Sequence, residues 1–91
     1  MARVLVHYDI TENEFRVKFQ SAITNPAFNH QFTKETESVY CTRFNTTDSN
    51  LEALVKALKQ AAAGAPAGTR ILMEHPTAYP GNPEITQTSI V

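Results

Sequence analysis

The sequence predicts an α+β domain with a ferredoxin-like βαββαβ order and an additional β segment at its C-terminal end, and it is expected to be dimeric. Three observations predict this class. The chain begins with an apolar run of period two, two later segments carry apolar residues at helical spacing, and the length of 91 residues suits a single domain. The order of these signals is that of the split β-α-β arrangement, in which both helices cover one face of the sheet.

The first strand is expected over residues 4–10, where β-branched residues recur at period two. Successive side chains of a strand point to opposite faces of its sheet. The alternation places Leu5, His7 and Asp9 on one face, and Val4, Val6 and Tyr8 on the other. Since the second group is apolar or aromatic, we expect it to face the helices.

The first helix is expected over residues 12–25. Thr11 and Glu14 have the spacing of a capping box, and Pro26 ends the helix because the residue before a proline is biased away from helical geometry. The apolar stripe of this helix consists of Phe15, Phe19, Ala22 and Ile23.

Two strands are expected between residues 27 and 44. Phe28, His30 and Phe32 alternate with polar neighbours, residues 34–37 form a polar bend, and residues 38–44 are rich in strong β-formers. The two segments are predicted to form an antiparallel hairpin.

The second helix is predicted to begin near Ser49, which forms a capping box with Glu52, and to end near Gly64. Its apolar face consists of Leu51, Leu54, Val55, Leu58 and Ala62. A fourth strand follows at residues 69–75. Residues 1–75 are therefore expected to form the ferredoxin-like domain.

Residues 76–91 are expected to form a Pro-rich extension that ends in a strand. Residues 85–91 have high β propensity and no charge follows Glu84. A loose, uncharged, β-prone segment is an aggregation hazard. We therefore expect this segment to dock as an edge strand, either on its own sheet or exchanged with a partner subunit.

Composition limits the classes of function. Eight basic and nine acidic side chains give a net charge of −1, which is no electrostatic footprint for strong, sequence-blind binding to duplex DNA. The single cysteine, Cys41, allows neither an intrachain disulfide nor a cysteine cluster for zinc. The sequence shows neither a membrane-spanning run nor a signal-peptide pattern, so the cytoplasm is the expected location and no membrane partner is expected.

Asp9 is the strongest candidate for a site residue. It ends the first strand where the chain turns towards a helix, a position where sites gather in α/β sheets. A carboxylate there can bind a divalent cation, meet its symmetry mate in a dimer, or only support the turn. His7 lies two residues away on the same face, where it could take part in proton transfer or metal binding, or only bond to a neighbouring side chain. Ser38, at the start of a strand, is expected to be a turn hydroxyl.

Several of these segments have counterparts in a known family. The strand that ends in Tyr8-Asp9, the segment Ser38-Val39-Tyr40 and the later strand around Ile71 resemble, in the same order, the small CRISPR-associated ferredoxin-like proteins of spacer acquisition. Virulence-associated toxin-type ribonucleases are relatives of that family.

The resemblance implies a homodimer in which two copies of Asp9 approach each other. In family members with nuclease activity these acids hold a divalent metal, so Asp9 would be both catalytic residue and ligand of Mg²⁺ or Mn²⁺, with His7 and Ser38 as accessory groups. Such an ion would activate water and neutralise charge on a phosphodiester. Many members are structural adaptors instead. Members of that family commonly have a basic first helix with several Arg or Lys residues. The first helix of this chain has only Arg16 and Lys18 as basic residues, beside the acidic Glu12 and Glu14.

Three functions therefore remain open. The first is a metal-dependent endonuclease, with RNA preferred over DNA as substrate. The second is a catalytically silent adaptor that bridges nucleic acid and a protein. The third is a small inhibitor or regulatory protein that acts through protein–protein contacts, which the near-zero net charge favours over the second.

Overall fold

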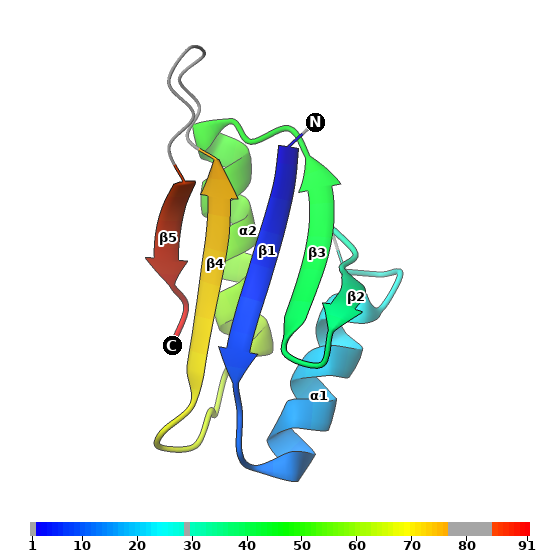
Figure 1. Cartoon of the computed structure of the whole chain (residues 1–91), viewed down its shortest axis with the longest axis vertical. Helices are drawn as coiled ribbons and strands as arrows, with labels where there is room; N and C mark the ends of the chain where they lie inside the picture. The colour runs from blue at the N-terminus through cyan, green and yellow to red at the C-terminus, as the bar shows by residue number, and fades with distance from the viewer. Residues whose placement is uncertain (1, 29, 77–84) are drawn as a thin grey trace.

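The fold is described from a computed structural model, for residues 2–28, 30–76 and 85–91. It is a small α+β structure with two helices and a five-stranded antiparallel sheet (Figure 1). The elements in chain order are β1 (Ala2–Asp9), α1 (Asn13–Thr24), β2 (Thr33–Thr36), β3 (Val39–Phe44), α2 (Asp48–Ala61), β4 (Arg70–Pro76) and β5 (Ile85–Ser89).

The sheet has the strand order β2-β3-β1-β4-β5, and each neighbouring pair is antiparallel. The first four strands in this order, with one helix after β1 and one after β3, are compatible with the predicted ferredoxin-like arrangement. The predicted fifth strand is present. It lies on the outer side of β4 in the same chain.

Both helices lie on one face of the sheet, behind the strands in the view of Figure 1. The alternation predicted for the first strand is confirmed, since Val4 and Val6 are fully buried and Tyr8 is 7% exposed, whereas Asp9 is exposed. The core lies between the helices and this face. Its largest fully buried side chains are Phe19, Ile23, Phe32, Leu54, Leu58, Ile71 and Met73.

The predicted helices form, but their caps differ from the capping boxes expected from the sequence. At α1 the N-cap is Glu12, whose carboxylate accepts hydrogen bonds from the backbone of Glu14 at 3.0 Å and of Phe15 at 2.8 Å. At α2 the N-cap is Thr47, which makes no side-chain capping bond. A carboxylate can replace Thr11 because it accepts two N–H groups at the positive end of the helix. Within the described residues, neither helix is long and apolar enough to cross a membrane.

The prediction for residues 27–37 is wrong. β2 (Thr33–Thr36) covers most of the predicted bend at residues 34–37, and the expected strand around Phe28 and Phe32 is instead part of the loop that leads into β2. Phe32 is 1% exposed, its N–H donates to the carbonyl of Ile23 at 2.8 Å, and its ring lies 6.1 Å from that of Phe28. These aromatic residues alternate because they anchor a loop against α1, and the same spacing resembles a strand.

Candidate functional site

The end of β1 brings all three predicted site residues together. His7, Asp9 and Ser38 line one depression of about 320 Å³, together with Arg70 and Ser89. Asp9 is exposed and pairs in register with Arg70, the first residue of β4. The depression therefore combines a carboxylate, a guanidinium, an imidazole and hydroxyl groups, which is a set suited to a polar or charged ligand.

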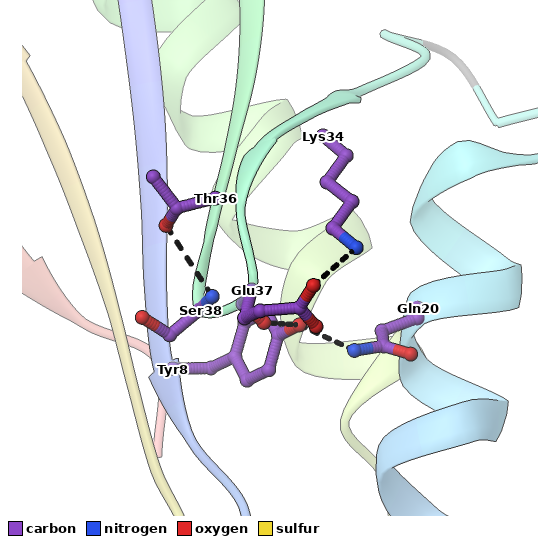
Figure 2. Close-up of polar contacts among 6 residues, drawn as sticks. All are labelled: Tyr8, Gln20, Lys34, Thr36, Glu37 and Ser38. Atoms are coloured by element: carbon purple, nitrogen blue, oxygen red, sulfur yellow. Dashed lines mark hydrogen bonds and ion pairs between the residues drawn. The ribbon is translucent and has the colours of Figure 1, made fainter.

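Ser38 reaches this depression because Tyr8 fastens the β2–β3 turn to the end of β1. The N–H of Tyr8 donates to the carbonyl of Ser38 at 3.0 Å, and its hydroxyl donates to the carbonyl of Glu37 at 2.6 Å. The side-chain amide of Gln20, in α1, donates to the same hydroxyl (Figure 2). Burial raises the pKa of Tyr8 above its ordinary value, because it disfavours the charged phenolate.

Polar contacts inside the turn complete this attachment. The Lys34 ammonium lies 2.8 Å from the Glu37 carboxylate, and the N–H of Ser38 donates to the Thr36 hydroxyl at 3.4 Å (Figure 2). The hydrogen bond and charge of Lys34 lower the pKa of Glu37, and the carboxylate in return raises the pKa of Lys34. The turn is thus ordered by side chains on its outer surface as well as by Tyr8.

His7 is directed to Glu74 on the neighbouring strand. Its Nε2 lies 3.4 Å from the Glu74 carboxylate, and that carboxylate also accepts a hydrogen bond from Gln87 of β5 at 3.4 Å. The three side chains form a polar row across β1, β4 and β5 on the face without helices. His7 can therefore act on a ligand at Asp9 only if it turns away from Glu74.

The described residues of a single chain around Asp9 do not fit a divalent metal ion. Asp9 brings one carboxylate, and its register partner Arg70 places a positive charge on the neighbouring strand. Among the residues that the structure describes, no group of three or more His, Cys, Asp and Glu side chains could hold a metal. A hard cation needs several oxygen ligands. Such a site would therefore require a second carboxylate from another chain.

The face of the sheet without helices is a mixed apolar and charged surface. Leu5, Val39 and Leu72 lie half-buried at its centre. Around them lie charges of both signs, including an Arg3–Glu35 ion pair at 3.2 Å. Arg43 stands directly opposite Arg3 in the register. Every Phe and Tyr side chain that the structure describes belongs to the core or packs against it, so none of them gives this face a platform on which bases could stack.

A second concave surface lies between α2 and the strands β4 and β5. This groove of about 750 Å³ has apolar walls that include Leu51, Val55 and Met73, and Lys56 and Lys59 lie at its rim. It exists because β5 extends the sheet beyond the two helices that cover it. Its histidine, His75, is 8% exposed and directs Nδ1 to the carbonyl of Pro76 at 3.0 Å.

Sequence reasoning did not predict how three further residues contribute to the site. Arg70 and Glu74 become neighbours of Asp9 and His7 only through the pairing of β1 with β4, which joins distant segments. Tyr8 was expected in the core, where it lies, but its role in holding the β2–β3 turn was not foreseen. The local signal for that role was weak, because any buried tyrosine needs a partner for its hydroxyl.

Comparison of the chain with protein-family models, with curated proteins and with solved structures finds no match.

Proposed function

We propose that the chain is a catalytically silent protein-binding adaptor, which binds a partner protein on the sheet face without helices and, unlike the bridging adaptor expected from the sequence, does not bind nucleic acid there. The observation that supports this most directly is the composition of that face. Leu5, Val39 and Leu72 are half-buried apolar side chains on it, with His7 between Val39 and Leu72 in the register. Polar contacts flank them, among them the Arg3–Glu35 ion pair and the His7–Glu74 contact. Protein interfaces have this anatomy, with an apolar core and a polar rim.

Nucleic acid fits this face less well than protein does. The guanidinium of Arg3 is paired with the Glu35 carboxylate, Glu74 adds a further carboxylate beside His7, and the whole chain carries a net charge of −1. Binding to a phosphate backbone depends on an excess of clustered Lys and Arg. Since the described Phe and Tyr side chains belong to or pack against the core, they offer single-stranded RNA no stacking partner on this face.

A photo-crosslinking residue placed at Leu72 tests this proposal, with the same residue at Val17 as the matched control. Val17 is 50% exposed on α1, in the helical layer, and offers a similar apolar side chain away from the face. In extracts of cells that express the chain, we expect a discrete protein adduct from position 72 and none from position 17. Nucleic-acid adducts at position 72, or equal adducts at both positions, would refute the proposal.

The second candidate is a metal-dependent endoribonuclease, favoured by the convergence of His7, Asp9 and Ser38 in one depression beside Arg70. Here Asp9 of two chains would bind Mg²⁺ or Mn²⁺, and the ion would supply Lewis acidity and an activated water. Labelled single-stranded RNA and DNA are incubated with purified protein, with either metal and then with chelator. Cleavage that requires metal and disappears in Asp9→Asn, with Asp48→Asn as control, would replace the adaptor by this candidate.

A further inference from the structure

We infer that the free edge of β5 is a homodimer interface, in which β5 pairs antiparallel with β5 of a second copy to form one continuous sheet across both chains. This goes beyond the adaptor function and does not depend on it. The inference comes from the backbone geometry of β5, from its side chains, and from the way the opposite edge of the sheet is built.

The outward backbone groups of β5 follow from its ladder with β4. The N–H of Ile90 donates to the carbonyl of Ile71 at 2.8 Å. In an antiparallel ladder, residues that bond to the neighbouring strand alternate with residues that do not. Pro76, which has no N–H, stands opposite Ile85 at a position that needs none. The backbone N–H and C=O groups directed away from β4 are therefore those of Ile85, Gln87 and Ser89.

The outward N–H and C=O groups of β5 can pair with the same groups of a second copy when a two-fold axis lies at Gln87. In that register Gln87 faces Gln87 of the second copy, and the outward groups of Ile85 face those of Ser89. On the helix side, Thr86 faces Thr88 of the second copy, a cross-strand pair that stabilises sheets. β5 carries no charged side chain, so the pairing places no like charges opposite each other. A two-fold axis makes every such contact occur twice.

The edge also lacks the features that prevent strand pairing. Natural edges are protected by charges, bulges, prolines or very short strands. β5 has five residues in regular register with β4, and none of them is proline or charged. No described strand pairs with its outer side. An edge of this kind is a template for another strand, and the second copy is the occupant that its symmetric sequence fits.

This dimer determines how far apart the two copies of Asp9 lie. In the joined sheet β1 and its copy are separated by five inter-strand steps, so they lie about 24 Å apart. The two copies of Asp9 cannot then share one metal ion. Both helix-free faces, however, lie on the same side of the joined sheet, so the dimer presents two adaptor surfaces to one side.

Gln87→Pro, with Gln87→Ala as the matched control, tests the interface by sedimentation velocity. Proline removes an N–H that faces away from β4, so the ladder with β4 keeps its hydrogen bonds. In the dimer the same change removes both hydrogen bonds at the two-fold axis. We expect Gln87→Pro to weaken dimerisation by about tenfold or more, and Gln87→Ala, which keeps the N–H, to weaken it by less.

Amide hydrogen exchange of the unmodified chain gives a second, independent readout. The amides of Ile85, Gln87 and Ser89 should become protected as protein concentration rises, while protection in β2 stays constant. A chain that remains monomeric, or a dimer that is lost in Leu72→Lys and retained in Gln87→Pro, would overturn the inference. A monomeric chain leaves the crosslinking outcome at Leu72 unchanged, and a dimer through that face would appear there as an adduct of two copies of this chain, which its mass distinguishes from an adduct with another protein. The interface and the adaptor function can therefore fail separately.

Discussion

The two edge strands of the sheet, β2 and β5, differ in charge, length and regularity of pairing. β2 has four residues, all exposed, among them Lys34 and Glu35, and its register with β3 shifts between Lys34 and Thr36. β5 has five uncharged residues in regular register with β4. Charge, shortness and irregular pairing all disfavour the addition of another strand. By these criteria the sheet is closed to a further strand at β2 and open to one at β5.

The edges also differ in what attaches them to the fold. Side chains attach the β2 edge to the fold. They are Phe32 in the core, the Tyr8 hydroxyl, and two ion pairs, Arg3–Glu35 and Lys34–Glu37. The β5 edge is held by its backbone ladder, by the hydrogen bond from Gln87 to Glu74 at 3.4 Å, and by Ile90, which is 7% exposed in the core. Ion pairs and a buried aromatic side chain thus attach the β2 edge, while the β5 edge depends mainly on backbone pairing that a second strand can extend.

The largest expected effect is at the attachment of β2. Phe32→Ala should lower the free energy of unfolding by about 3–5 kcal/mol, because it leaves a cavity beside α1. That is a large part of the roughly 5–15 kcal/mol by which small domains are stable. Urea denaturation measures the change, with Phe28→Ala, half-buried, as a control of smaller effect. A loss below about 1 kcal/mol for Phe32→Ala would mean that the core does not fasten this edge.

The extent to which the fold could be predicted varies with the range of the interactions. The alternation of Val4, Val6 and Tyr8 and the stripes of both helices are local patterns, and they predicted the layers. The position of β2 was missed because Phe28 and Phe32 have the spacing of a strand, while their partners lie in α1 and the core. The correct position depends on pairing with β3, which local propensity does not report.

The site shows the same limit. Asp9, His7 and Ser38 could be selected from their types and positions, and the structure brings them into one depression. Their neighbours Arg70 and Glu74 could not, because strand register is set by long-range pairing. A shift of one residue would turn each of them to the opposite face of the sheet.

The second effect in size concerns the attachment of β5. Ile90→Ala should cost about 2–3 kcal/mol and should act on this edge first, since Ile90 ties the end of β5 to the core. Hydrogen exchange should show faster exchange throughout β5, with β2 unchanged. Ile85→Ala, at a side chain that is 61% exposed, should change stability by less than about 0.5 kcal/mol. Equal acceleration in β2 and β5 would show that the two edges are not attached separately.

Tyr8→Phe tests the polar attachment of the β2–β3 turn. It removes a hydroxyl that donates to the Glu37 carbonyl and accepts from Gln20, while the ring keeps its place 6.0 Å from Phe19. We expect a loss of about 1–2 kcal/mol in thermal or urea unfolding. The turn, and Ser38 with it, should become more mobile in NMR relaxation, whereas β5 should not change.

The same tyrosine gives a pH dependence with a defined sign. The folded chain raises the pKa of Tyr8 above 10.0. The contribution of the Tyr8 hydroxyl to the free energy of unfolding is therefore fully present below about pH 10 and is lost as the pH rises through the folded-state pKa. Stability of the native chain should therefore fall in this alkaline range more steeply than that of Tyr8→Phe. Parallel pH profiles for the two proteins would contradict a buried, hydrogen-bonded hydroxyl.

The smallest effect on stability is expected for the ion pair of Lys34 and Glu37. A change at this pair distinguishes whether charge at the β2 edge stabilises the fold or prevents a further strand from pairing. Lys34 lowers the pKa of Glu37 below 4.5, so any contribution is present above that pH and is lost as the pH falls through the folded-state pKa. An NMR titration of the Glu37 carboxylate should show this lowered pKa in the native chain and in Lys34→Arg, and an ordinary one in Lys34→Met. Both groups are exposed, so the unfolding transition should barely move. If Lys34→Met nevertheless makes the chain associate through β2, charge at this edge acts to exclude a further strand, as its absence at β5 permits one.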